Sequence, residues 1–331
     1  MGENMRIAVI IPYFQREPGI LRKAVQSALN QRGVIRPYII VVDDSSPVPA
    51  ASELAGLLPE YREDIMVIEQ PNAGPGGARN TGIDAIPDEI ELVAFLDSDD
   101  EWAPDHLQNA MEALHAGCDF FFADHWDYSG ETTRFGRSRE RGTFRPHDHP
   151  LIRIDSPLHW FSGDFVDQLI REYVIGAPTV VVRRSFLDQH RFPTRFRKAG
   201  EDHLLWLKIA ASGAKVAFSE RVECRMGKGV NIYDGSGWGT EGALERIVDY
   251  CGLLATMRLE YAKTEAQKDL LSRRLAQSRR EFVRVFVHDI VRGRLKSARY
   301  AWRQLRYDPL TMAIFFPELT RIVLERIQPV S

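Results

Sequence analysis

The chain has few cysteines and no long apolar run, and both shortages narrow the classes of protein that it can belong to. Its three cysteines, Cys118, Cys224 and Cys251, are odd in number and widely spaced among 331 residues. They form neither a disulfide framework nor a zinc-binding pattern, so they predict a reducing cytoplasm. No apolar stretch approaches the roughly 18 residues of a membrane-spanning helix, and the first residues lack the layout of a signal peptide. We also find no internal repeat and no low-complexity segment.

The net charge of −3 is small, but the charges are unevenly distributed. From Glu241 to the end the chain has 17 Lys and Arg against 11 Asp and Glu, a balance of +6, which leaves −9 for the first 240 residues. We therefore expect a globular domain over 1–240 and a basic helical region over 241–331, with different partners. Nucleic-acid binding is not expected, because the larger part is acidic and contains no recognition motif.

The first part alternates strand-like and helix-like segments. IAVIIPYF (7–14) is a continuous apolar run, which is typical of a strand buried on both faces, and 20–31 has the apolar stripe of a helix. The rhythm predicts an α/β fold with a mainly parallel sheet covered by helices on both faces, followed by a C-terminal helical extension. Between 128 and 173 we expect an irregular insertion with one helix near 165–172. The other expected strands are 38–44, 64–70, 92–96, 118–126 and 215–225, and the other expected helices are 78–86, 104–117 and 201–213, with regular structure also at 179–187.

Acidic side chains follow two of the expected strands. VVDDSS contains Asp43 and Asp44, and FLDSDD contains Asp97, Asp99 and Asp100. Ligands of open parallel sheets bind beyond the carboxyl ends of the strands, and clustered carboxylates suit a hard divalent cation. The plainer explanation of the first pair is a turn or a helix cap. The second set is more specific, because an explanation without a ligand requires all three acids to be solvated directly beside the buried LVAFL.

A glycine-rich segment, PNAGPGGARNTG (71–82), lies between these acids in the sequence. Glycines such as Gly77 allow the backbone to approach a ligand closely, and we expect Arg79 and Asn80 to open the next helix. A helix N-terminus with an arginine suits a diphosphate, although a glycine-rich turn before a helix is also common without any ligand. Together with the acids, the segment predicts Mg²⁺ or Mn²⁺ held between carboxylates and a nucleotide diphosphate.

Five blocks of the chain resemble the landmarks of the family 2 glycosyltransferases, in the same order. They are IIPYFQR, VVDDSSP, NAGPGGARNTGI, FLDSDDEWAPDHL and GEDHLLWLKIA, and the resemblance covers about residues 5–225. It implies the GT-A fold and an inverting, metal-dependent transfer from a nucleotide sugar. The blocks, with EPGILRKA and GKGVNIY, further resemble the glucosyltransferases of bacterial succinoglycan-type exopolysaccharide assembly, which implies UDP-glucose as donor and a saccharide as acceptor.

The resemblance also implies which residues bind the nucleotide. Pro12 and Tyr13 would border the base, Asp44 would accept a hydrogen bond from uracil, and Arg79 would reach the base or the diphosphate. Lys228 is a further candidate for the diphosphate, because positive charge there stabilises the departing UDP. The family often has Thr-Tyr-Asn after the first proline, whereas this chain has Tyr-Phe-Gln.

The remaining roles concern metal and catalysis. Asp97 and Asp99 would be the two acids of the DxD motif, one directed at ribose and the other at the metal. Asp100 is an additional acid, so whether Asp99 or Asp100 holds the metal stays open. A single displacement needs a base for the acceptor hydroxyl, and Asp202 of GED is the candidate, although acids are also favoured in the first turn of a helix. Trp238, between glycines, would belong to a flap over the donor.

The C-terminal region has a strongly basic stretch. Residues 273–306 contain 11 Lys and Arg against Glu281 and Asp289, interleaved with apolar residues such as Phe282, Val283 and Val285. A helix with an apolar stripe and a cationic face can lie on anionic lipid, so we expect contact with the cytoplasmic face of the membrane and a lipid-linked acceptor. The alternative is a helical hairpin that packs on the catalytic domain or forms a homodimer.

Two other functions compete with a glycosyltransferase. A sugar nucleotidyltransferase is also α/β and metal-dependent, but it normally has a glycine-rich loop directly after the first strand, and IIPYFQREPG has none. A non-catalytic nucleotide-sugar-binding scaffold would share the binding residues and would lack turnover.

Overall fold

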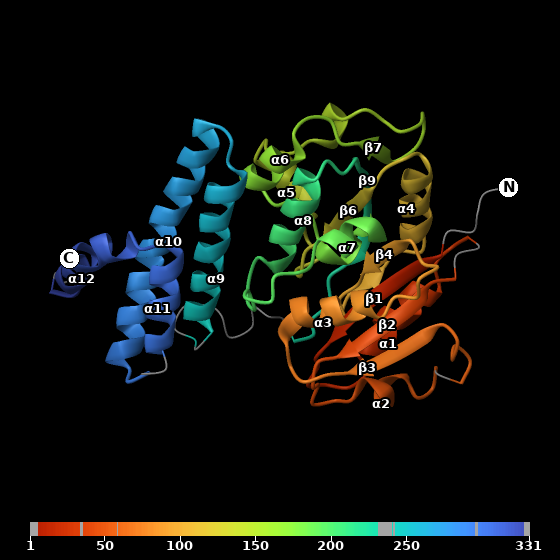
Figure 1. Cartoon of the computed structure of the whole chain (residues 1–331), viewed down its shortest axis with the longest axis horizontal. Helices are drawn as coiled ribbons and strands as arrows, with labels where there is room; N and C mark the ends of the chain where they lie inside the picture. Colours follow the sequence, from red (N-terminus) through yellow and green to blue (C-terminus); the bar gives the residue numbers. More distant parts are fainter. Residues whose placement is uncertain are drawn as a thin grey trace. The chain divides into compact units, whose positions relative to one another are not determined.

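The computed structural model describes residues 6–33, 36–57, 59–230, 240, 242–294 and 297–327. The chain forms two compact units, shown in Figure 1. The first contains the residues up to Thr194 together with Leu205–Val230, and the second contains Arg195–Leu204 together with the C-terminal helices. The first turn of one helix, Glu201–Ala211, therefore belongs to the second unit and the rest of that helix to the first. The expected domains 1–240 and 241–331 stay a prediction.

The first unit is built on a nine-stranded mixed sheet with the order β3-β2-β1-β4-β8-β6-β9-β5, in which β7 also pairs with β9. The longer ladders are parallel: β1 with β2 and β4, β2 with β3, and β6 with β9. The short strands β5, β7 and β8 pair antiparallel with their neighbours. The α/β fold with a mainly parallel sheet is confirmed. The strands are β1 Ile7–Tyr13, β2 Tyr38–Asp43, β3 Ile65–Glu69, β4 Leu92–Phe95, β5 Glu101–Trp102, β6 Phe120–Trp126, β7 Leu158–Trp160, β8 Val181–Arg183 and β9 Val216–Arg225.

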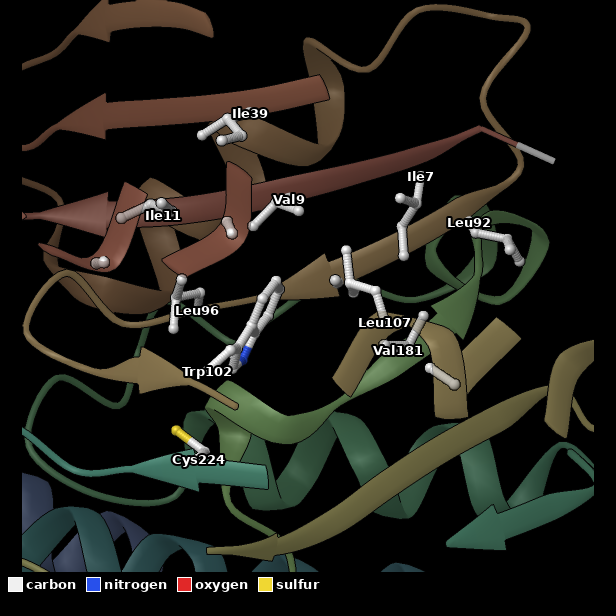
Figure 2. Packing of buried hydrophobic residues seen from close by; sticks show 14 of the residues in the cluster. Ile7, Val9, Ile11, Ile39, Leu92, Leu96, Trp102, Leu107, Val181 and Cys224 are labelled. Carbon is white, nitrogen blue, oxygen red and sulfur yellow. The ribbon is translucent and has the colours of Figure 1, made fainter. Parts of the chain in front are cut away.

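Helices cover both faces of the sheet, which explains why the strands are apolar throughout. Ile7, Val9 and Ile11 of β1 belong to one core cluster with residues of α1, α2 and α4, part of which is shown in Figure 2. On the other face α3 packs so closely on β1 that a Cβ at Gly82 would lie 2.6 Å from Ile10 Cγ2. The helices of this unit are α1 Leu21–Leu29, α2 Ala50–Leu54, α3 Gly74–Asp84, α4 His106–His115, α5 Arg134–Glu140, α6 Phe165–Arg171 and α7 Arg184–Gln189, with most of α8 Glu201–Ala211.

One expectation about α3 is wrong. The helix begins at Gly74, so Arg79 and Asn80 lie well inside it and do not open it. The physical reason is that the carboxylate of Asp44 accepts hydrogen bonds from the N–H groups of Ala73 and Gly74, which would otherwise lack partners at the helix start. The segment 128–173 is also more regular than expected, since it contains α5 and β7 besides the predicted helix α6.

Helices are the regular structure of the second unit in the part of it that the structure describes. Its core cluster joins α9 residues such as Ile247 with Phe282, Val283 and Val285 of α10, which are at most 3% exposed. The expectation that these three residues face lipid is therefore wrong, because they pack against neighbouring helices. No helix in the described ranges combines the length and the apolar character needed to cross a bilayer. The helices are α9 Ala243–Thr256, a π-helical turn at Met257–Tyr261, α10 Glu265–Val291, α11 Ala298–Tyr307 and α12 Thr311–Ile327.

Candidate active site

The turn that contains Asp97, Asp99 and Asp100 follows β4 and is covered by the segment 226–230 after β9. The N–H of Gly227 donates to Asp100 Oδ1 and the N–H of Gly229 donates to Asp99 Oδ2, both at 2.8 Å. There is no room for side chains at this contact: a Cβ at Gly227 would lie 1.6 Å from the carbonyl oxygen of Asp99. The two glycines of GKG are therefore required by the close approach of two backbones.

The three carboxylates lie close together in the chain, so their negative charges repel one another. Asp100 is 3% exposed, and burial, together with the nearby charges of Asp97 and Asp99, raises its pKa well above the usual range. Asp97 has a basic partner, since Arg79 Nη2 lies 2.7 Å from its Oδ1. Like charges gathered at a strand end favour a cation among them.

This donor set fits a hard divalent cation that completes its shell with other oxygens. Carboxylate oxygens of Asp99 and Asp100 are the ligand type that Mg²⁺ and Mn²⁺ prefer. Among the described residues, no group of three His, Cys, Asp or Glu side chains is arranged to enclose a metal ion.

Gln15 joins the elements of this edge, and the sequence interpretation did not assign it a role. Its side chain is 2% exposed; Nε2 donates to Ser98 Oγ at 3.0 Å, and Oε1 accepts from the N–H of Val230 at 2.7 Å. Its backbone exchanges two hydrogen bonds with the hydroxyl of Ser46. The departure from the family pattern at this position was the signal that could have identified it. Gln15 ties the end of β1, the acidic turn and the segment 226–230 together.

The acids after β2 stabilise local structure. Asp43 accepts N–H bonds from Ser46 at 2.7 Å and Ala50 at 2.8 Å, so it holds the turn before α2. Asp44 is 3% exposed and accepts hydrogen bonds from Gln70 Nε2 and from Ala73 and Gly74 at the start of α3. The simpler explanation, a turn or a helix cap, therefore fits both carboxylates: Asp43 holds the turn before α2, and Asp44 accepts the first N–H groups of α3. An anion binding at the start of α3 would have to share its N–H groups with Asp44.

The remaining predicted nucleotide-binding residues lie around the same edge. Pro12 is half-buried near the end of β1, and the adjacent Tyr13 is buried, which raises the pKa of its phenol to about 12. Arg79 is 5% exposed, and its guanidinium lies 5.3 Å from the ring centroid of Phe192 while it pairs with Asp97.

Three further predicted residues lie in α3 and in the segment after β9. Asn80 exchanges two hydrogen bonds of 2.9 Å with the backbone of Phe192, so its amide serves to anchor that segment. Gly77 lies inside α3, where a Cβ would be 2.5 Å from Ala73 Cβ. Lys228 is exposed at the tip of the segment that covers the acidic turn. Trp238, the predicted flap residue, lies outside the described residues.

The candidate base, Asp202, lies in the first turn of α8 in the second unit. Its side chain is half-buried, and Oδ1 accepts a hydrogen bond of 2.7 Å from the N–H of His203. Gly200, two residues earlier, has φ +94°, which a residue with a side chain rarely adopts, and it packs against Leu253 of α9. The GED sequence thus combines a glycine required by the backbone with two acids favoured at a helix start.

Comparison with known proteins agrees with this geometry. The model of the family described as "Glycosyl transferase family 2" matches residues 8–189. That range contains the nine predicted site residues from Pro12 to Asp100 and excludes Asp202 and Lys228. The chain belongs to the family 2 glycosyltransferases. It is similar to the succinoglycan biosynthesis protein ExoW of Rhizobium meliloti (strain 1021), with 36% identity over 233 residues, 69% of this chain and 70% of that protein. The expected family and enzyme class are confirmed.

Solved structures support the fold of this glycosyltransferase. S. aureus TarS 1-349 in complex with UDP-GlcNAc matches with a TM-score of 0.51 and 16% identity, covering 95% of this chain and 92% of that chain. The mannosyltransferase PcManGT from Pyrobaculum calidifontis, in complex with GDP-Man and Mn²⁺, matches with a TM-score of 0.52 and 16% identity, covering 94% and 86%. At these identities the likeness shows the fold alone, which is the expected GT-A type. The two relatives were solved with different nucleotide sugars, so the fold does not select the donor.

Proposed function

We propose that this glycosyltransferase transfers a hexose, glucose from UDP-glucose, onto a saccharide acceptor of exopolysaccharide synthesis with inversion at the anomeric carbon. The observation that carries the proposal is the acidic turn after β4, which gathers three carboxyl groups under a backbone segment that has no room for side chains. The similarity to ExoW supports the exopolysaccharide assignment, because that relative is a succinoglycan biosynthesis protein.

In the proposed complex Asp99 and Asp100 hold a divalent cation, Mn²⁺ or Mg²⁺, and Asp97 faces the ribose. Asp99 is the more exposed of the two metal candidates. When bound, the cation neutralises the charge that develops on the diphosphate of the departing UDP. Arg79 keeps Asp97 oriented through their ion pair, and Lys228 adds positive charge beside the leaving group. Pro12, Tyr13 and Asp44 border the base, and Gly77 and Asn80 keep the adjoining backbone in place.

The same proposal gives Asp202 the role of general base. An acceptor hydroxyl attacks the anomeric carbon from the side opposite UDP and loses its proton in the same step, so a carboxylate must accept that proton. Asp202 is supported by its place in the GED block and by its half-buried position at the start of α8. The two competing functions are a sugar nucleotidyltransferase and a scaffold, and family membership favours neither of them.

Slow hydrolysis of a panel of UDP-sugars tests the donor and the metal together. We expect UDP-glucose to be hydrolysed fastest in the presence of Mn²⁺ or Mg²⁺, and we expect EDTA to abolish the hydrolysis. UDP with Mn²⁺ should also raise the melting temperature more than either alone, because the acidic turn and the diphosphate would both supply ligands to the same cation. Equal rates of hydrolysis with and without EDTA would contradict the proposed need for a metal. Faster hydrolysis of another UDP-sugar would contradict glucose as the transferred sugar.

We also propose that the acceptor is carried on a lipid and that the protein contacts the cytoplasmic face of the membrane through its C-terminal helices. The charges of the second unit support this location. Between residues 270 and 324 the four described acids are each within ion-pair distance of an arginine. Asp289, Asp308 and Glu318 are buried, and Glu281 is half-buried with its side chain 41% exposed. The exposed charges of that stretch are therefore basic: Arg273, Arg280, Arg292, Arg299, Arg306 and Arg321.

Large apolar side chains are exposed beside these arginines. Trp302 on α11 is 67% exposed, and Phe316 on α12 is also 67% exposed, with Leu310, Met312 and Leu324 above one half. Arg306 lies over the Trp302 ring at 5.9 Å. A surface that combines aromatic and aliphatic side chains with positive charge suits the boundary between headgroups and acyl chains of an anionic bilayer.

Vesicle binding measures this contact. We expect co-sedimentation with vesicles that contain anionic lipid and little with neutral ones. The double substitution Arg299→Gln with Arg306→Gln should weaken binding about thirtyfold, since each arginine near the surface contributes about 1 kcal/mol. The comparison is Arg273→Gln with Arg280→Gln, the same change of charge on α10 and not on the helix that carries Trp302, which should weaken binding less. Concentration-dependent dimerisation through Trp302 and Phe316, without vesicle binding, would instead favour the homodimer.

A further inference from the structure

One buried carboxylate of the second unit holds the segment that enters α8. Asp249 of α9 is 0% exposed, and its Oδ2 accepts N–H bonds from Arg197 and from Lys198, both at 2.8 Å. Two consecutive N–H groups on one oxygen leave the backbone little freedom. The Asp249 side chain therefore attaches the segment 195–200, which ends just before α8, to the C-terminal helix α9.

Arg303 of α11 completes this attachment. Its Nη2 donates to Asp249 Oδ1 at 2.5 Å and to the carbonyl oxygen of Arg195 at 3.1 Å. A buried carboxylate without a charged partner would be strongly destabilising, so Arg303 both neutralises Asp249 and contacts the segment itself. Asp249, Arg303 and the backbone of the segment 195–200 thus form one connected network of hydrogen bonds.

Close packing reinforces the network at both ends. Besides its positive φ, Gly200 has so little space that a Cβ would lie 2.9 Å from Leu253 Cδ2. On α9, a Cβ at Gly252 would lie 2.8 Å from Phe196 Cε1 and 3.0 Å from the ring of Tyr307. Because neither glycine leaves space for a methyl group, the elements are closely packed at both points. A shift of α9 or α11 would therefore be transmitted to the start of α8.

We propose that Asp249 and Arg303 are positioning residues for Asp202: by fixing the segment 195–200 they set the direction in which the first turn of α8 presents the Asp202 carboxylate. The inference rests on the proposed role of Asp202 as general base. It gives the C-terminal helices α9 and α11 a part in turnover that does not depend on membranes. Binding of the nucleotide, which concerns residues of the first unit, is independent of it.

The test is a set of conservative substitutions with separate measurements of turnover and UDP binding. Asp249→Asn keeps the shape of the side chain, but its NH₂ group faces either the two backbone N–H groups or the Arg303 guanidinium, which are all donors. We expect kcat to fall about 100-fold, the effect of a displacement of about 1 Å, with the Kd for UDP and Mn²⁺ unchanged. Arg303→Lys keeps the charge and loses one of its two contacts, so it should fold even if Asp249→Asn does not and should lower kcat about tenfold.

A matched control separates positioning from stability. Asp308 is also buried and pairs with Arg279 at 2.5 Å and 3.0 Å, a contact that joins α10 to the end of α11. Asp308→Asn should lower the melting temperature as Asp249→Asn does and should leave kcat within twofold. An equal loss of kcat in Asp308→Asn would overturn the proposal, as would unchanged kcat in both Asp249→Asn and Arg303→Lys.

The pathway of the effect is tested in a double variant. If Asp249 acts through Asp202, adding Asp249→Asn to Asp202→Asn should not slow turnover further, since the displaced group is already inactive. A further 100-fold loss in that background would overturn the proposal. Failure of the proposed function would look different, because Asp202→Asn alone would then retain turnover.

Discussion

Asp202→Asn is expected to lower kcat about 1,000-fold while the Kd for UDP and Mn²⁺ stays within twofold of the wild type. The amide has nearly the shape of the carboxylate but cannot accept the proton of the acceptor hydroxyl, and general-base catalysis contributes about 10²–10⁴-fold to a rate. Turnover is measured with a saccharide acceptor and UDP-sugar, and binding by calorimetry. A variant that keeps most of its turnover would exclude Asp202 as base.

The control for this substitution is Asp167→Asn. Asp167 lies in the first turn of α6, as Asp202 lies in the first turn of α8, and it pairs with Arg171. Both substitutions remove a negative charge from a helix start, which costs about 0.3–1 kcal/mol of stability. If the loss of turnover came from helix stability alone, the two variants would behave alike. The same measurement distinguishes the transferase from a non-catalytic scaffold, because the wild type of a scaffold would show no turnover.

Gly227→Ala is expected to weaken binding of UDP and Mn²⁺ by about 10- to 100-fold. Its methyl group would lie 1.6 Å from the carbonyl oxygen of Asp99, so the segment 226–230 must move away from the acidic turn. The hydrogen bond from its N–H to Asp100 is then lost, and hydrogen bonds to charged groups are worth about 1.5–3 kcal/mol. Calorimetry with UDP and Mn²⁺ measures the effect, and kcat/KM should fall in parallel.

Alanine substitutions at two other glycines serve as comparisons for Gly227→Ala. At Gly229 a Cβ would lie 2.6 Å from Gln15 Nε2 and 2.7 Å from Asp99 Cβ, which is less severe than the 1.6 Å at Gly227, so Gly229→Ala should have a smaller effect. At Gly56 the nearest atom would be Arg22 Nη2 at 3.5 Å, an ordinary contact, and Gly56→Ala should bind UDP as the wild type does. Wild-type binding by Gly227→Ala would show that the segment does not support the metal site.

The acidic site could be located from the sequence because its signals are local. An apolar run that ends in FLDSDD places three acids at the end of a buried strand whatever the rest of the chain does, and β4 ends at Phe95 as that pattern requires. The same reasoning placed Asp202 at a helix start. It could not find Gln15 or the cover formed by 226–230, because the hydrogen bond that joins Gln15 to Val230 connects residues far apart in the chain.

The start of α3 shows why boundaries are harder to predict. Glycines and a proline in GPGG favour a loop, yet they form the first turn of the helix. The stabilising partner is the carboxylate of Asp44, which directly follows β2 and lies about 30 residues before the helix. The same separation in sequence explains Phe282, Val283 and Val285: their stripe fits lipid and protein equally well, and only the neighbouring helices show that they are buried.

The sequence by itself determined the family, the α/β alternation and the acids that end β4, because each depends on residues close together in the chain. The tertiary structure alone decided which groups those residues contact. It assigned Asp44 to a helix start, Gln15 to a junction of three segments, and Asp249 with Arg303 to the approach to α8. The physical reason is that burial and hydrogen-bond partners arise between distant segments, which no local pattern of residues specifies.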